Sequence, residues 1–244
     1  MSEEKQEKIS IVREYVDSLL VTVILALFGI TFLVQAFKIP SQSMEETLLV
    51  GDHLLVNKFV FADSNGGGVA LLPYRDVTRG DIIVFKYPFP PYQHFVKRVI
   101  GLPGDRLRVV ERQVYINGEL LQEPYKIHRS ANYPSSVADD FPPPGGSYYF
   151  RMESSWREEL MVLRQGDELV IPKGKYFVMG DNRDNSQDSR YWGLVDRHNI
   201  IGRPLIIYWS FDASAPSARG QARREGGDGV FDRTRWNRLL RLVR

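Results

Sequence analysis

Phe95-Val-Lys-Arg-Val-Ile-Gly-Leu-Pro-Gly-Asp105 is the stretch that decides the fold, because it has the pattern of a strand followed by a tight turn. Successive side chains of a strand point to opposite faces. Lys97 therefore shares one face with Phe95 and Val99. The last four residues include the proline, glycine and aspartate that turns favour. The stretch predicts a β-strand that ends where the chain reverses.

Runs of the same kind recur along the chain. They are short, rich in β-branched and aromatic residues, and bounded by Gly, Pro, Asn or Asp, which is typical of strands. These runs are His53–Phe61, Asp81–Tyr87, Val114–Ile116, Lys175–Gly180 and Ile200–Trp209. Asn117-Gly118 predicts a type I′ hairpin between Val114–Ile116 and Glu119–Leu121. The pattern predicts a mainly β protein, an antiparallel β-sandwich or open barrel.

The length of the chain limits its domain organisation. Its 244 residues, 43% hydrophobic and 25% charged, suffice for an N-terminal segment plus one sizeable core or two small domains. We expect a β-rich domain over residues 38–212. Residues from about 122 to 165, with Phe141-Pro-Pro-Pro-Gly-Gly146 among them, predict an inserted small subdomain. Residues 65–68, Asn-Gly-Gly-Gly, predict a flexible loop tip.

An uncharged stretch, Ser18–Phe37, lies near the N-terminus between Asp17 and Lys38. Its roughly 20 residues, at about 1.5 Å each in a helix, just cross a hydrocarbon layer of about 30 Å. A cleaved secretory signal has a shorter apolar core, so we expect a transmembrane helix, with a buried core helix as the alternative. More basic residues precede the stretch than follow it, which favours a cytoplasmic tail over residues 1–17. The rest of the chain would then lie on the outer, periplasmic face of the cytoplasmic membrane.

Several kinds of chemistry are excluded or disfavoured by composition. The chain has no cysteine, which excludes disulfides, thiolate catalysis and cysteine-bound zinc. Its four histidines show no metal-binding spacing, so we expect no metal and no cofactor.

The net positive charge of the chain comes entirely from its C-terminal tail. Residues 218–244 contain eight arginines against three acids, a charge of +5, whereas the whole chain has a net charge of +2. Trp236, Leu239, Leu240 and Val243 have helical spacing. We expect a basic linker and an amphipathic helix over residues 213–244, lying either at the membrane interface or on the protein's own body. Basic residues confined to one short tail disfavour nucleic-acid binding.

Ser41-Gln-Ser43-Met44 directly follows the uncharged stretch and offers a hydroxyl nucleophile close to the membrane. Such a hydroxyl needs a neighbouring base. The motif G-x-S-x-G is absent, and S-x-x-K occurs only at Ser2–Lys5, ahead of the uncharged stretch. No histidine lies in an informative context. Lys97 faces an apolar surface, where burial would lower its pKa and favour the neutral amine. On the strand alone, a lysine that extends its ammonium group to water is the commoner alternative.

A polar loop, Gly180–Gly193, follows an apolar strand. Its composition is typical of a solvated turn. Its alternating acids and arginines, followed by Tyr191 and Trp192, also suit a packed, hydrogen-bonded loop. Such a loop would position a catalytic lysine through Ser186 and Asp188.

Five segments occur in a fixed order along the chain: Ile39–Leu48, Gly51–Lys58, Arg79–Pro88, Val96–Asp105 and Gly180–Arg190. Together they resemble the boxes of bacterial type I signal peptidases, the leader peptidases with a Ser/Lys dyad. The likeness runs from about Phe37 to Trp209.

The resemblance implies a role for individual residues. Ser43 matches the nucleophile and Lys97 the general base. Ser41 matches the oxyanion-hole hydroxyl, and Ser186 the serine that holds the lysine. Residues that match ion-pair supports of the site are Asp181, Asp188 and Arg190. Residues that match the lining of the substrate pockets are Phe37, Ile39, Pro40, Met44, Leu48, Val84, Phe95 and Val96.

The resemblance also implies a reaction: removal of N-terminal signal peptides from exported preproteins, after small residues in an Ala-x-Ala pattern, through an acyl-enzyme. The implied partners are preproteins and membrane lipid, and we expect a monomer. Another Ser/Lys protease of the self-cleaving repressor type, or a non-catalytic anchored β-domain that binds preproteins, are the alternatives. The chain departs from the family at Glu46, which stands where proline is usual, so the turn after the nucleophile loses a stiff residue. The single anchor and the basic tail also differ from some relatives.

Overall fold

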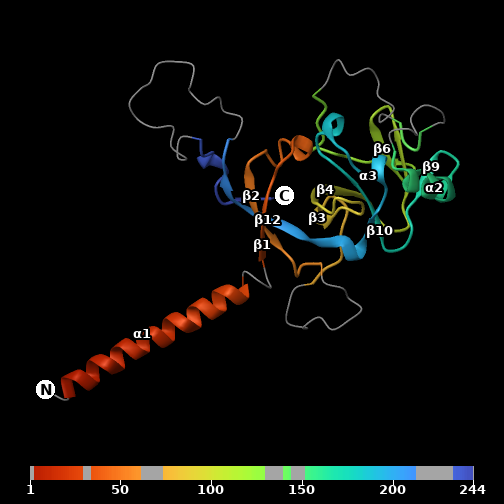
Figure 1. The fold of residues 1–244 in the computed structure, drawn as a ribbon. Helices are drawn as coiled ribbons and strands as arrows, with labels where there is room; N and C mark the ends of the chain where they lie inside the picture. Colours follow the sequence, from red (N-terminus) through yellow and green to blue (C-terminus); the bar gives the residue numbers. More distant parts are fainter. Residues whose placement is uncertain are drawn as a thin grey trace, which may run out of the picture.

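The computed structural model describes residues 3–29, 34–61, 74–129, 140–143, 152–212 and 233–243. The loop tip expected at residues 65–68 and the basic linker from 213 to 232 lie outside them. Helix α1 (Glu3–Phe28) extends away from a body built mainly of strands (Figure 1).

The larger sheet contains most of the strands that the sequence predicts. Its eight strands follow the order β1-β2-β12-β3-β4-β10-β11, with β13 paired to β12, and every pairing is antiparallel. These strands are β1 (Val34–Lys38), β2 (Asp52–Asn57), β3 (Ile82–Lys86), β4 (His94–Gly101), β10 (Lys175–Met179), β11 (Val195–Asp196), β12 (Ile200–Ser210) and β13 (Arg241–Leu242). The expected strands of this region are confirmed, with their ends shifted by a few residues.

The smaller sheet has five antiparallel strands in the order β7-β6-β5-β9-β8. They are β5 (Arg106–Val110), β6 (Gln113–Ile116), β7 (Glu119–Leu120), β8 (Arg164–Gln165) and β9 (Glu168–Val170). Asn117 and Gly118 have φ values of 54° and 86°, so the predicted type I′ hairpin is confirmed. The mainly β, antiparallel fold class is confirmed with it.

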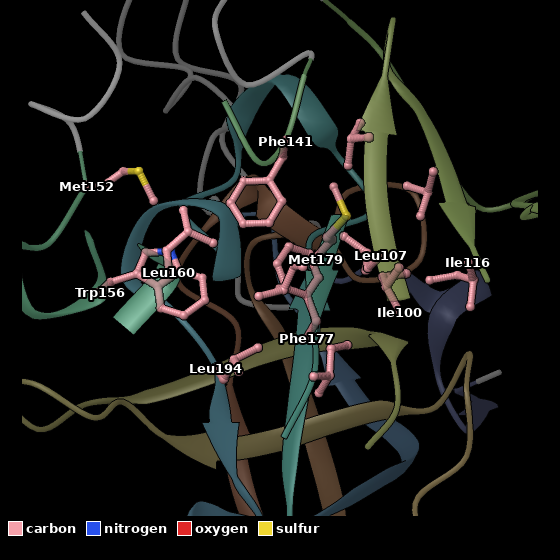
Figure 2. Close-up of a cluster of buried hydrophobic side chains, with 14 residues drawn as sticks. Ile100, Leu107, Ile116, Phe141, Met152, Trp156, Leu160, Phe177, Met179 and Leu194 are labelled. Atoms are coloured by element: carbon pink, nitrogen blue, oxygen red, sulfur yellow. The ribbon is translucent and has the colours of Figure 1, made fainter. Parts of the chain in front are cut away.

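A large apolar core joins the two sheets (Figure 2). Leu107 and Ile116 come from the smaller sheet, and Phe177 comes from β10 of the larger one. Trp156 of helix α2 (Ser154–Leu163) and Phe141 stack in the same core, with ring centroids 6.4 Å apart. The described part of the predicted insertion therefore packs on the smaller sheet, rather than forming a separate subdomain over residues 122–165.

The helix expected over Ser18–Phe37 is wrong at its C-terminal end. Helix α1 ends at Phe28, and Val34–Lys38 forms β1, which pairs with β2 from Val34↔Asn57 to Lys38↔His53. An apolar run with β-branched and aromatic residues suits a strand as well as a helix, and pairing with β2 decides for the strand. Over the residues described, no helix combines the length and apolar character needed to cross a membrane.

The amphipathic C-terminal helix is also wrong for the described residues 233–243. A single 3₁₀ turn, η6 (Trp236–Arg238), is followed by strand β13. Leu240 has φ of 58°, which interrupts any helix, and Arg238 is buried although the helical pattern placed it on the polar face. The segment packs on the protein's own body because Arg238 pairs with Asp52 and β13 pairs with β12.

Candidate active site

The loop that carries Ser43 is closed at its base by backbone hydrogen bonds. Ile39 N donates to Asp52 O at 2.8 Å, and Gly51 N donates to Ile39 O at 3.0 Å. Gly51 has φ of 90°, and a side chain there would overlap the Phe211 carbonyl, so the closure requires glycine. The 3₁₀ turn η2 (Gln42–Met44) then places Ser43 in a buried position.

Lys97 lies against Ser43. Its Nζ atom is 2.6 Å from Ser43 Oγ, in hydrogen-bond contact across 54 residues of sequence. Only 4% of Lys97 is exposed, so the lysine does not extend its ammonium group to water. The alternation of side chains along β4 predicted that Lys97 points toward the apolar interior, and the structure places it there.

The surroundings of Lys97 favour its neutral form. Burial lowers the pKa of Lys97 from its ordinary value of 10.5 to about 8, with Arg190 acting in the same direction. The carboxylates of Asp188 and Asp181 oppose this by raising the pKa. A neutral amine beside a hydroxyl can accept the hydroxyl proton, so the pair is able to act as base and nucleophile.

The two further serines lie near this pair but differ in their contacts. Ser41 is exposed, and its Oγ is 3.4 Å from Ser43 Oγ. Ser186 is buried, and its hydroxyl is one of the groups that hold the pKa of the Asp188 carboxyl below its ordinary value. In the described parts of the chain the hydrogen bond of Lys97 Nζ goes to Ser43 and not to Ser186.

The polar loop after β10 is packed and not solvated. Asp188 is fully buried and forms a two-pronged ion pair with Arg190, with distances of 2.8 Å and 2.9 Å. Asp188 also accepts a hydrogen bond from Gly180 N at 3.1 Å. Burial alone would raise the pKa of the Asp188 carboxyl, but Arg190 and Lys97 hold it below its ordinary value. The loop therefore keeps a carboxylate behind the lysine.

A second buried ion pair includes a residue that the sequence analysis did not place in the site. Arg98 donates to both carboxylate oxygens of Asp181, at 2.8 Å and 2.7 Å. Thr47 Oγ1 donates to Asp181 Oδ2 at 2.6 Å, and Asn182 N donates to Ser43 O at 3.1 Å. Arg98 follows Lys97 on β4, and the alternation that points one inward sends the other to the opposite face. The signal in the sequence was an arginine between apolar residues of a strand, directly after Lys97.

Gly180 and Arg183 hold the polar loop in register with Ser43. A side chain at Gly180 would overlap both Ser186 Oγ and the Ser43 carbonyl, so close approach requires glycine there. Arg183 donates to Gly180 O at 3.1 Å and is ion-paired with Glu123, and both side chains are buried. Glu123 lies at the start of the predicted insertion and was not predicted as part of the site.

A pocket of about 420 Å³ opens beside Ser43 and Lys97. Residues of the predicted set that line it are Phe37, Ile39, Pro40, Met44, Phe95 and Val96. Leu48 and Val84 do not line it; both are fully buried in the apolar cluster behind it, together with Ile39 and Met44. Polar residues that were not predicted to line the pocket are Gln93, His94, Asn185 and Gln187. Within the described ranges, no group of three or more His, Cys, Asp or Glu side chains is placed to hold a metal ion.

Glu46 occupies a backbone conformation that proline cannot adopt. Its φ is 60°, whereas proline is fixed near −65°. Arg129 contacts Glu45 at 2.9 Å and Glu46 at 3.7 Å. The turn after the nucleophile therefore has a different path from one built on proline, and ion pairs with Arg129 now support it.

The comparisons with known proteins agree on one family. The sequence pattern of the family "Signal peptidase, peptidase S26" matches residues 12–209. Signal peptidase I of Pseudomonas aeruginosa is 36% identical over 234 residues, which cover 85% of this chain and 76% of the relative. Signal peptidase I of Aquifex aeolicus is 36% identical over 227 residues, covering 81% and 84%. A crystal structure of a signal peptidase I from Enterococcus faecalis is 32% identical, covers 53% of this chain and 97% of its own, and has a TM-score of 0.35.

The chain belongs to the signal peptidase family, peptidase S26. It is therefore a peptide-bond hydrolase of the signal peptidase I type, whose reaction is the removal of signal peptides.

Proposed function

We propose that the chain is an endopeptidase that cuts exported preproteins by means of a Ser43/Lys97 dyad. The observation that carries the proposal is the 2.6 Å contact between Lys97 Nζ and Ser43 Oγ in a pocket where burial lowers the pKa of the lysine. The family to which the chain belongs supplies the class of substrate.

The proposed reaction begins when neutral Lys97 accepts the proton of Ser43. The freed Ser43 oxygen attacks the carbonyl carbon of the scissile peptide bond, and the carbonyl oxygen becomes an oxyanion. The Ser41 hydroxyl and the Ser43 backbone N–H are the proposed donors to it, and such a donor is typically worth about 3 kcal/mol. Lys97 then gives its proton to the leaving amine as the C–N bond breaks. Water, deprotonated by the same lysine, releases the acyl-enzyme.

Four buried side chains are proposed to support the dyad. Asp188 and Arg190 hold the loop behind Lys97, and Asp181 with Arg98 holds the Thr47 hydroxyl of the nucleophile loop. Ser186 is proposed to contact the lysine or a water molecule once substrate fills the pocket, because its buried hydroxyl acts on Asp188, the carboxylate behind the lysine.

The lining of the pocket supports a preference for small side chains at the first and third positions before the cut. Phe95 and Val96 are half-buried on β4, and Ile39 and Met44 are buried at the pocket floor. Well-packed apolar walls exclude bulk sterically, whereas each added methylene gains only about 1–3 kcal/mol. Leu48 and Val84 are proposed to act indirectly, by supporting this floor from the core.

A preprotein with Ala-x-Ala before its mature start tests the proposed function. Incubated with the detergent-solubilised full chain, it should be cut once, and N-terminal sequencing should identify the first mature residue. The matched substrate with Leu at both small positions should be cut at least about tenfold more slowly. Binding without cleavage would favour the non-catalytic anchored domain. Cleavage of the chain itself and not of the preprotein would favour a self-cleaving protease.

We further propose that α1 holds the enzyme at the cytoplasmic membrane, with the catalytic domain on the outer face. The support is a helix that extends from the body (Figure 1) with a large exposed apolar surface. The exposed residues include Leu19, Leu20, Val21, Ile24, Leu25, Leu27 and Phe28. Contiguous apolar surface of this kind marks a membrane or protein contact.

Cell fractionation tests membrane attachment. The full chain should sediment with membranes after a high-salt wash, because burial in lipid and not charge holds it. A Leu20→Asp/Ile24→Asp variant should shift to the soluble fraction, since charges on the apolar surface oppose insertion. Lys86→Asp, at an exposed position on β3, is the control and should sediment with membranes as the parent chain does. Equal sedimentation of all three proteins would contradict attachment through α1.

A further inference from the structure

Thr47 fixes the loop that carries Ser43, and it is held from two sides. On one side its Oγ1 donates to Asp181, which belongs to the polar loop of the site. On the other side its backbone carbonyl accepts a hydrogen bond of 3.0 Å from Arg238 Nη2. Arg238 comes from the C-terminal segment, residues 233–243, which the proposed reaction does not use.

Arg238 forms a two-pronged ion pair with a fully buried carboxylate. Its Nε and Nη2 atoms donate to the two carboxylate oxygens of Asp52, at 3.1 Å and 2.6 Å. Asp52 is fully buried and Arg238 is 5% exposed. Asp52 also accepts hydrogen bonds from Leu49 N at 2.8 Å and Ser210 Oγ at 2.6 Å. Asp52 therefore closes the end of the nucleophile loop, and Arg238 links this closure to Thr47.

The rest of the C-terminal segment is tied to the same loop and to the sheet beneath it. Arg235 Nη1 donates to Val50 O at 2.9 Å. Leu240 N donates to Ile207 O at 2.8 Å, next to the β12–β13 pairing. Val243 is buried in the apolar cluster that also contains Met44. Backbone, side-chain and core contacts thus all join this segment to the region around Ser43.

We propose that the C-terminal segment is a built-in support of the active site, and that Arg238 is a positioning residue for Ser43. This inference rests on the proposed function, because it concerns the same nucleophile. A planar guanidinium donates in several fixed directions, so Arg238 satisfies the Asp52 carboxylate and the Thr47 carbonyl at once. Without it the loop keeps its fold but loses a fixed point four residues from Ser43, and the contact with Lys97 becomes less well aligned.

Arg238→Met is the main test, with Arg241→Met as its matched control. Arg241 lies on the same segment but is exposed, and the described residues show no hydrogen bond from its side chain to the loop. Its variant therefore makes the same chemical change without removing a hydrogen bond that holds the loop. For preprotein cleavage, Arg238→Met should lower kcat by roughly 10-fold to 100-fold while KM changes by less than about twofold, because misalignment affects the chemical step and not the pocket. Arg241→Met should change neither. A kcat of Arg238→Met equal to that of Arg241→Met would overturn the proposal.

A second pair of variants separates positioning from general stability. Arg238→Met leaves Asp52 charged and buried without its partner, which destabilises the fold. In Arg238→Met/Asp52→Asn no unpaired charge remains, so the melting temperature should recover while kcat stays low. Arg238→Lys keeps the charge but not the fork, and its kcat should be intermediate. Recovery of kcat together with the melting temperature in the double variant would show a merely structural role.

The activity of Ser43→Ala distinguishes a failure of the Arg238 proposal from a failure of the proposed function. If Ser43→Ala is inactive and Arg238→Met is fully active, only the support role fails. If Ser43→Ala retains activity, the dyad itself fails, whatever Arg238→Met does.

Discussion

Ser43→Ala and Lys97→Met are each expected to abolish preprotein cleavage, lowering kcat by at least about 10³-fold. The first variant removes the attacking oxygen, and the second removes the only amine within hydrogen-bond distance of it among the described residues. Groups that act as a unit lose most of their effect when either one is removed, so the double variant should be no slower than either single variant. Cleavage rates for the three proteins, measured with one preprotein, test this.

Both substitutions should leave the fold intact. Lys97 is buried beside Phe95, whose ring centroid lies 5.8 Å from its Nζ, so a methionine of similar length suits the same space. Ser43→Ala removes one atom from a buried turn. Circular dichroism and the melting temperature should match those of the parent protein. Lys86→Met, which removes an exposed lysine from the neighbouring strand β3, is the control and should be fully active. Turnover retained in Ser43→Ala or Lys97→Met would rule out the dyad.

The direction of the catalytic lysine was predictable because strand alternation is a local property. The run around Lys97 has a clear period of two, and the pairing Ile83↔Lys97 with β3 keeps it. The partner of the lysine was not predictable from periodicity. Ser43 lies on a short 3₁₀ turn, and only the closure of its loop against β4 brings the two side chains together. The resemblance to a family supplied the pairing that local patterns lacked.

The buried ion pairs mark a second limit of sequence reasoning. The alternating acids and arginines of the polar loop correctly indicated a packed structure, since Asp181, Arg183 and Asp188 are all buried. Which arginine meets which acid depends on strand order. Asp181 pairs with Arg98 from β4, whereas Asp188 pairs with Arg190 two residues away. Charge pattern predicts the presence of such pairs, and tertiary structure selects the partners.

The two corrected elements have a common cause. Val34–Lys38 continues an apolar run that suits a helix, and residues 236–243 have helical spacing, yet both segments pair with strands of the larger sheet. Free backbone groups at a sheet edge offer hydrogen bonds that local propensity does not register. At the C-terminus, burial of Arg238 against Asp52 also opposes the amphipathic helix, because that helix would expose the arginine to water.

The rate of preprotein cleavage is expected to fall steeply in acid, with a midpoint set by Lys97. Burial lowers the pKa of Lys97 to about 8 in the protein without substrate, and kcat/KM reports the ionisation of the free enzyme. Only the neutral amine accepts the Ser43 proton, and protonation increases as the pH falls. kcat/KM should therefore be half its plateau value near pH 8 and lose about a factor of ten for each further pH unit below it. At pH 6 it should be about 100-fold below the plateau.

Histidine is the competing explanation for an acid limb, because its ordinary pKa of about 6.5 also falls in this range. His94 lines the pocket and packs edge-on against Phe37, with ring centroids 5.3 Å apart. In a His94→Gln variant the limb should keep its midpoint and its slope, since Lys97 is unchanged. An acid limb that disappears in His94→Gln would assign the base to the histidine. A limb that stays near pH 8 identifies the buried amine of Lys97 as the titrating group. Burial lowers the pKa of this lysine from 10.5 to about 8, which is where the limb is expected.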